Sequence, residues 1–108
     1  EAPTERRLVE GAALRPATVL KVPHHGSRTS STEDFLAETR PAFAVISAGK
    51  DNPFRNPHPE VLARLGRLRT AVLRTDLLGA VTLRSDGSGI EVETARYAAA
   101  SQGRWQPF

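Results

Sequence analysis

One stretch of the sequence reads Thr18-Val19-Leu20-Lys21-Val22-Pro23-His24-His25-Gly26-Ser27. Four of the five residues quoted before Pro23 are apolar or β-branched, the exception being Lys21. Proline lacks the N–H that a sheet requires, so the pattern predicts a strand over residues 18–22 that ends at Pro23. Two of the three histidines of the chain follow directly. We therefore expect any chemistry of this protein to lie at the end of this strand.

Helix and strand signals alternate on both sides of this stretch. Pro3, with Glu5 in the first turn, favours a short helix over residues 3–12, and Ser30 with Glu33 matches a capping box for a helix that runs to about Thr39. Pro59 suits the first position of a third helix. Strands are further expected over residues 43–47, 70–75, 80–84 and 90–94, the first apolar on both faces and the last two forming a hairpin around Asp86-Gly87-Ser88-Gly89.

The predicted order is therefore α-β-α-β-α-β-β-β, which indicates a layered α/β fold. In such folds ligands bind at the carboxyl ends of the strands. The His24-His25 turn follows the first strand and the loop from Lys50 to His58 follows the second, so we expect both to open on one edge. Residues 1–94 form the expected domain, and residues 95–108, which lack a clear period, are expected to be a C-terminal tail.

Composition sets broad limits on the function. The chain has 108 residues, enough for one small domain or part of a larger one, and 25% of them are charged. A net charge of +3 tolerates a polyanion such as nucleic acid, although many proteins that bind none have the same balance. The absence of cysteine excludes disulfides and cysteine-ligated zinc. No apolar run approaches the ~20 residues of a membrane span, and the Glu-Ala-Pro start suggests a piece of something longer.

The two adjacent histidines are candidates for metal or substrate binding. Side chains of successive residues diverge at a strand end, so one imidazole can bind a metal while the other contacts substrate. Gly26 permits a positive φ angle, and Ser27 can donate a hydrogen bond to a phosphate oxygen. The alternative from residue types alone is a surface turn with two solvated histidines.

The loop after the second strand carries further candidates. His58, between two prolines, suits either a substrate contact or a cap of the helix that follows. Lys50, Asn52 and Arg55 suit phosphate binding, yet solvated loops commonly carry such residues. The hydroxyl residues that follow Gly26 are expected to serve mainly in turns and caps, and these are Ser27, Thr29, Ser30, Ser31 and Thr32.

No second cluster of metal-ligating residues is evident in the sequence. A binuclear hydrolase needs several histidine and aspartate ligands to hold its ions and generate hydroxide. Either the chain is not catalytic, or the rest of the site lies outside it.

Four spaced motifs, considered together, resemble a known family. They are Leu20-Lys-Val-Pro-His-His-Gly-Ser-Arg-Thr-Ser-Ser31, Val45-Ile-Ser-Ala-Gly-Lys-Asp-Asn52, Asn56-Pro-His-Pro-Glu-Val-Leu62, and Arg74-Thr-Asp76 with Gly79-Ala-Val81. In this order they resemble the C-terminal metallo-β-lactamase-like domain of ComEC-type competence proteins, the membrane channels of bacterial DNA uptake.

The resemblance implies an αββα sandwich of which this chain is the C-terminal half. The family's HxHxDH cluster and its later Gly-Asp pair are missing from this sequence. What carries over is the last metal-ligating histidine, for which the resemblance favours His25, with His24 beside the metal or against the substrate; the reverse remains possible. His58 matches a later family histidine with an expected role near the substrate, and Arg55-Asn56-Pro57 stands where relatives often have Gly-His-Pro.

The implied function is a metal-dependent phosphodiesterase that acts on DNA during transformation. The implied cofactors are divalent ions, zinc or manganese, as a binuclear centre in the complete domain. The implied partners are DNA, the remainder of the same domain and a membrane channel domain upstream, with this domain on the outer face of the bacterial cell membrane. This fragment alone is expected to be inactive. The alternatives are a non-catalytic module that guides DNA in the same channel, and a metallo-hydrolase of small phosphoesters.

Overall fold

The computed structural model describes residues 1–96 and the backbone of residues 103–105. The elements are, in order, α1 (Ala2–Glu10), β1 (Val19–Lys21), the tight turn η1 (Pro23–Gly26), α2 (Glu33–Thr39), β2 (Phe43–Ile46), α3 (Pro59–Arg67), β3 (Ala71–Arg74), α4 (Thr75–Leu78), β4 (Val81–Ser85), β5 (Ile90–Thr94) and β6 (Gly103–Trp105). The predicted α/β class and the predicted alternation of helices and strands are confirmed. The short helix α4 and the strand β6 are additions that the sequence pattern did not indicate.

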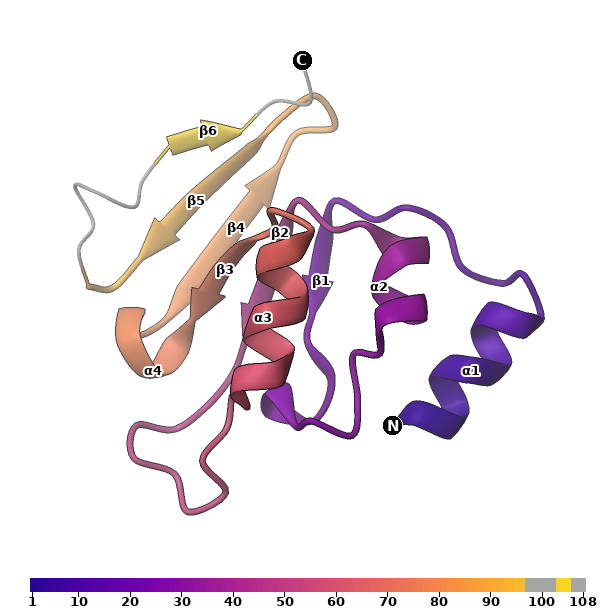
Figure 1. The fold of residues 1–108 in the computed structure, drawn as a ribbon. Helices are drawn as coiled ribbons and strands as arrows, with labels where there is room; N and C mark the ends of the chain where they lie inside the picture. Colours follow the sequence, from indigo (N-terminus) through magenta and orange to yellow (C-terminus); the bar gives the residue numbers. More distant parts are fainter. Residues whose placement is uncertain (97–102, 106–108) are drawn as a thin grey trace.

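Two three-stranded sheets form the framework of the fold. The first has the order β1-β2-β3 with all strands parallel, and the second has the order β4-β5-β6 with antiparallel pairs. Parallel neighbours need a crossover between them, and α2 and α3 are those crossovers. Figure 1 shows both helices on one side of the parallel sheet and the second sheet beside it. The carboxyl ends of β1 and β2 consequently lie at one edge.

Strand β2 is buried on both faces, as its apolar sequence predicts. Ala44 and Ile46 belong to a core with Val22 and the apolar faces of α2 and α3. Phe43 instead packs against Ile90 and Val92 of β5 in a second, smaller core. The parallel sheet is thus covered by helices on one face and by the antiparallel sheet on part of the other.

The β4–β5 hairpin follows its sequence pattern closely. In β5 buried and exposed residues alternate, with Ile90, Val92 and Thr94 buried. The carboxylate of Asp86 accepts hydrogen bonds from the backbone N–H groups of Ser88 and Gly89, which closes the turn within its own residues. Within the expected tail, the backbone of residues 103–105 pairs with β5 as β6. Residues 97–102 and 106–108 lie outside the described part, and the domain boundary at residue 94 stays a prediction.

The predicted capping box at the start of α2 is wrong. Thr32, two residues later than predicted, is the N-cap, and its hydroxyl accepts a hydrogen bond from the backbone N–H of Phe35. The hydroxyl of Ser30 instead donates to the backbone carbonyls of Pro23 and Ser27. The predicted partner, Glu33, pairs with a basic residue of α3. A long-range contact explains the shift.

That contact comes from Glu5 of α1, a glutamate that is only 3% exposed. Its two carboxylate oxygens accept hydrogen bonds from the backbone N–H groups of Ser31, at 2.7 Å, and Thr32, at 2.8 Å. Arg64 of α3 donates to the carbonyls of Ser30 and Ser31 in the same turn. A buried carboxylate from another helix therefore satisfies the backbone N–H groups of the two residues that directly precede α2. Among the described residues no helix combines the length and apolar character of a membrane span.

Candidate functional site

The two polar loops predicted to share an edge do so. Because β1 and β2 are adjacent and parallel, η1 and the loop that ends at His58 leave the sheet at the same edge (Figure 1). The backbone N–H of His58 donates to the carbonyl of Gly26 at 2.9 Å, which ties the two loops together. The contact is close enough that a Cβ on Gly26 would lie 2.7 Å from the Cβ of Pro57.

The histidine turn has an unusual backbone. His24 (φ 50°, ψ 39°) and His25 (φ 57°, ψ 24°) both adopt left-handed angles, and Gly26 follows with φ 85°. Histidine tolerates this region better than most residues, yet each left-handed non-glycine residue costs on the order of 1–3 kcal/mol. Two in succession persist only where surrounding contacts hold them, and such conformations concentrate at functional sites.

One of those contacts fixes the ring of His25. Its Nδ1 lies 2.6 Å from the backbone carbonyl oxygen of Ser47, which directly follows β2. A carbonyl can only accept, so Nδ1 carries a hydrogen, and in the neutral imidazole Nε2 then carries the lone pair. Nε2 makes no hydrogen bond with the described residues, and the residue is exposed. An imidazole oriented through Nδ1–H to a carbonyl is the usual arrangement of a metal-ligating histidine.

His24 points to a different partner. Its Nδ1 lies 3.4 Å from a carboxylate oxygen of Glu1, and its side chain is 54% exposed. A side-chain hydrogen bond with Thr29, and secondarily the neighbouring His24, lower the pKa of Glu1. The adjacent rings therefore diverge, one toward the end of β2 and the other toward the start of α1.

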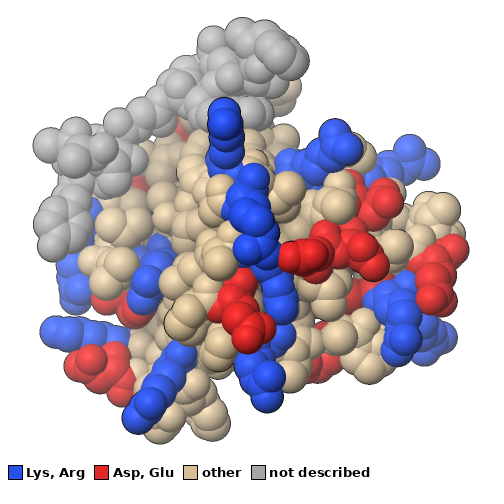
Figure 2. All heavy atoms as spheres, viewed as in Figure 1, with Lys and Arg blue, Asp and Glu red and all other residues tan. Residues whose placement is uncertain are grey.

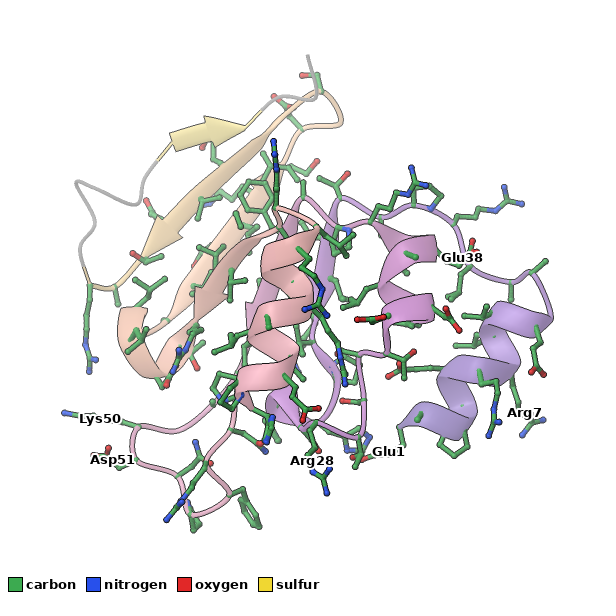
Figure 3. The ribbon with its side chains drawn as sticks, in the orientation of Figure 1. Glu1, Arg7, Arg28, Glu38, Lys50 and Asp51 are labelled. Atoms are coloured by element: carbon green, nitrogen blue, oxygen red, sulfur yellow. The ribbon has the colours of Figure 1, made fainter. Side chains whose placement is uncertain are left out.

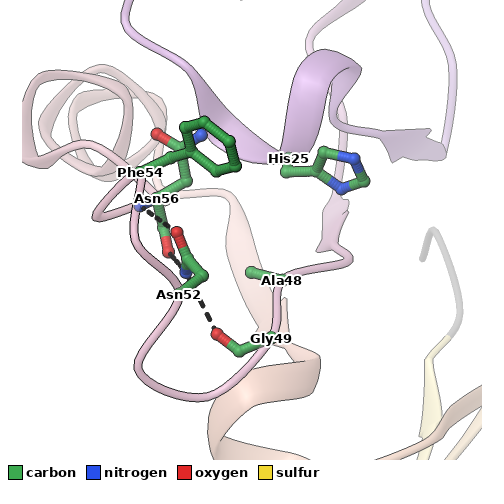
Figure 4. Close-up of a pocket in the computed structure, with 6 residues that line it drawn as sticks. All are labelled: His25, Ala48, Gly49, Asn52, Phe54 and Asn56. Atoms are coloured by element: carbon green, nitrogen blue, oxygen red, sulfur yellow. Dashed lines mark hydrogen bonds between the residues drawn. The ribbon is translucent and has the colours of Figure 1, made fainter.

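A pocket of about 140 Å³ lies beside His25. Its lining is His25, Ala48, Gly49, Asn52, Phe54 and Asn56. Figure 4 shows His25 and Phe54 on two sides of this pocket, with Ala48 and Gly49 along a third. The structure thus brings together two predicted site residues, His25 and Asn52, which lie 27 positions apart in the sequence.

Asn52 has a structural task in that loop. Its amide nitrogen donates to the carbonyls of Gly49, at 3.0 Å, and Asn56, at 2.6 Å. Its amide oxygen accepts from the backbone N–H of Asn56 at 3.0 Å. These bonds fix the shape of the loop, and a contact of Asn52 with substrate stays a prediction.

The other predicted site residues surround the pocket without lining it. Nδ1 of His58 accepts from the backbone N–H of Glu60 at 3.1 Å, so this histidine is the N-cap of α3. The hydroxyl of Ser27 bonds with that of Thr29 at 3.0 Å. Lys50 is exposed and extends away from the loop in Figure 3. Of the two roles that the sequence left open for His58, the structure contains the cap; a substrate role stays a prediction.

Three groups that shape the site were not predicted from the sequence. The carbonyl of Ser47 orients His25, and a backbone group leaves no mark in a sequence pattern. The hydroxyl of Thr75 donates to the carbonyl of Ala48 and accepts from its N–H, both at 3.0 Å, and so joins the end of β3 to the pocket wall. Phe54 was detectable as an aromatic residue in an otherwise polar loop.

Arg74 and Asp76 flank Thr75 and form a two-bonded ion pair. Nε and one terminal nitrogen of Arg74 donate to the two carboxylate oxygens of Asp76, at 3.1 and 2.7 Å. These hydrogen bonds from Arg74 lower the pKa of Asp76, and those to Asp76 raise the pKa of Arg74. The pair stabilises the segment in which Thr75 sits, and this gives the Arg74-Thr-Asp76 motif a structural role.

A metal centre would need more ligands than this chain gathers. Within residues 1–96, no three histidine, aspartate or glutamate side chains come together in a way that suits a metal ion. His25 fits the role of one ligand in its tautomer, exposure and orientation. One imidazole alone does not hold a catalytic metal.

Comparison with known proteins gives relatives in bacterial competence. The chain is 36% identical over 96 residues to Recombination protein 2 of Haemophilus influenzae, which covers 89% of the chain and 12% of that protein. It is 48% identical over 68 residues to ComE operon protein 3 of Bacillus subtilis, covering 63% and 9%. It is 37% identical over 78 residues to Competence protein ComA of Neisseria gonorrhoeae, covering 72% and 11%. The chain is therefore homologous to a part of these three competence proteins.

The chain spans about a tenth of the length of these curated relatives. No protein-family signature matches it, and no solved structure does. The predicted relationship to competence proteins is thereby confirmed, while the metallo-β-lactamase-like assignment of the fold stays a prediction.

Proposed function

We propose that this chain contributes one metal-ligating histidine to a metal-dependent phosphodiesterase site of a competence protein that acts on DNA. The observation that carries the proposal is the state of His25. Two successive left-handed histidines cost folding energy, and Ser47 holds the second of them with Nε2 available. Single left-handed residues also occur in exposed turns of this chain, for example at Arg40 and Arg69, but His24 and His25 are the only two non-glycine ones in succession among the described residues. Strain of this kind concentrates at functional sites.

In this proposal the remaining ligands come from a further part of the same domain. The layering of helices, parallel sheet and antiparallel sheet is compatible with half of an αββα sandwich. We assign this chain to the C-terminal half of such a metallo-β-lactamase-like domain, attached to a membrane channel domain and placed on the outer face of the bacterial membrane. The similarity to competence and recombination proteins supports a DNA-related function, and the channel partner is part of the proposal.

The residues of this chain then have distinct tasks. When bound, divalent ions such as zinc or manganese supply a nucleophilic hydroxide at neutral pH and stabilise charge on phosphorus. His25 presents Nε2, and the Ser47 carbonyl keeps its tautomer and ring orientation. His24, exposed on the other side of the turn, is assigned to the substrate, together with Ser27 and Lys50.

The test replaces His25 with asparagine in the longer protein that contains this chain. Asparagine tolerates the left-handed backbone but is too short to reach the imidazole Nε2 position. Loss of a group that merely orients a ligand costs roughly 10- to 100-fold in metal affinity or activity, so loss of the ligand should cost at least as much. The measurements are metal content and manganese- or zinc-dependent cleavage of DNA. Glu93→Ala, on the exposed face of β5, is the control and should keep both.

Unchanged metal content and cleavage in a folded His25→Asn protein would sink the assignment. The chain by itself should bind zinc weakly and turn over no substrate, and a tight one-to-one site in calorimetric titration would contradict this. The net charge of +3 is also compatible with a second function, a non-catalytic module that guides DNA. A guiding module would show DNA binding without metal-dependent cleavage. Cleavage of small phosphoesters in preference to DNA would instead indicate a third function, a metallo-hydrolase of small phosphoesters.

A further inference from the structure

Phe54 is the most exposed large apolar side chain in the described part of the protein. It is 79% exposed, against 52% for the next, Leu77. An isolated exposed apolar residue needs no explanation. This one lines the same pocket as His25, on the opposite side (Figure 4).

The loop that carries Phe54 is held in place. Asn52 bonds to Gly49 and to both backbone groups of Asn56, which brackets Phe54 on either side. The backbone N–H of Arg55 donates to the carbonyl of Asn52 at 3.1 Å. The ring therefore projects from a braced loop, and little conformational entropy is lost when a ligand contacts it.

Cations flank the ring on the same edge. Lys50 and Arg55 lie on the loop itself and are exposed, with Asp51 as the acidic neighbour. Figure 3 places Arg28 along the same lower edge, close to Glu1, and Figure 2 shows separate Lys and Arg side chains along that edge with acidic side chains beside some of them. An aromatic ring among cations is the combination with which proteins bind unpaired nucleic-acid strands, stacking on bases and pairing with phosphates.

We infer that Phe54 stacks on an unpaired base of the DNA substrate and so places a neighbouring phosphate at His25. This inference rests on the proposed function and names the form of its substrate, a single strand. The pocket, at about 140 Å³, is smaller than the roughly 300–1,000 Å³ of pockets that enclose a drug-sized ligand. The base therefore stays on the outer face of the Phe54 ring, and a group of phosphate size enters.

The experiment is a two-by-two comparison of protein and ligand. The longer protein that contains this chain and its Phe54→Ala variant are titrated at low salt, without added metal, with a short fluorescent oligothymidylate and with an abasic strand of equal length and charge. Stacking on one base predicts that Phe54→Ala weakens binding of the oligothymidylate about 5-fold or more and leaves binding of the abasic strand unchanged. Phe54→Trp should retain the preference for bases, and Leu77→Ala is the matched control that should change neither affinity.

Equal weakening on both strands would overturn the inference, because the ring would then act on the backbone or on the fold. Absence of any preference of the unmodified chain for base-bearing strands would also overturn it. A ring that is covered by another part of a longer protein would give a Phe54→Ala variant of lower thermal stability and no base preference, which is a further contradicting outcome. The His25→Asn cleavage test is independent: base stacking without cleavage rejects the proposed function alone, and cleavage without a Phe54 effect rejects this inference alone.

Discussion

The β4–β5 hairpin and the His24-His25 turn each reverse the chain through a left-handed glycine. In the hairpin, Gly87 has φ 88° and a Cβ added there would meet nothing within 4 Å. In the histidine turn, Gly26 has φ 85° and an added Cβ would meet Pro57 at 2.7 Å. The first glycine satisfies a local backbone requirement. The second also makes room for another loop.

The difference extends to the polar groups of the two regions. Asp86 closes the hairpin with hydrogen bonds to residues two and three positions away. The edge that carries the histidine turn is instead held by hydrogen bonds between distant residues. His25 bonds with Ser47 across 22 positions, and Glu5 with Ser31 across 26. The hairpin is thus a local structure, and the candidate site is a product of the whole fold.

Exchanging each glycine for alanine tests this difference most strongly. Gly87→Ala should lose only the backbone preference, about 1–2 kcal/mol of unfolding free energy. Gly26→Ala adds a clash with the Cα and Cβ of Pro57, so its loss should reach about 3 kcal/mol or more. Urea denaturation followed by circular dichroism measures both. Equal losses of unfolding free energy would show that the histidine turn and the loop with Pro57 separate easily. The edge would then be no more constrained than the hairpin.

What was predictable from sequence follows the same division. The alternation in β5, the double-sided burial of β2 and the first residue of α3 at Pro59 are local patterns, and each is confirmed. The parallel order of β1 and β2 follows from the helix between them. That order is why the shared edge of the two polar loops was predictable as well.

The details of the edge were not predictable, for physical reasons. The left-handed His25 is held by the carbonyl of Ser47, just after β2, and the start of α2 is shaped by a carboxylate from α1. Ser30 and Glu33 match a capping box in sequence. However, Glu5 binds the backbone N–H groups of Ser31 and Thr32 from another helix, and a local pattern does not contain that contact. The pocket was not predictable because it forms only where the loop that carries Phe54 comes to lie opposite His25.

A second prediction concerns the acidic residues of the two regions. Glu5→Gln replaces one accepting oxygen with an N–H donor that faces backbone N–H groups in a buried site, and should cost about 2 kcal/mol of unfolding free energy. Glu93→Gln disrupts an ion pair with Arg84 across the hairpin, in which both side chains are about half exposed. Such pairs contribute about 0–1 kcal/mol. Thermal and urea unfolding of the two variants gives the comparison.

A loss for Glu5→Gln no larger than that for Glu93→Gln would contradict the long-range account of the edge. It would mean that water reaches Ser31 and Thr32 when the carboxylate is absent. Amide hydrogen exchange at these two residues distinguishes this case, because their protection should fall in the variant only if Glu5 shields them.

Among the variants at this edge, the smallest expected effect belongs to His58, whose observed side-chain contact is local. Because its Nδ1 accepts from the N–H of Glu60, His58→Ala should lose an N-cap worth about 1 kcal/mol, and His58→Asn should regain most of it. If capping is its whole task, DNA cleavage by the longer protein should follow stability and recover in His58→Asn. If the imidazole also contacts substrate, stability recovers in that variant while cleavage stays low. A His58→Ala protein of unchanged stability would instead show that the N-cap hydrogen bond of His58 does not stabilise α3.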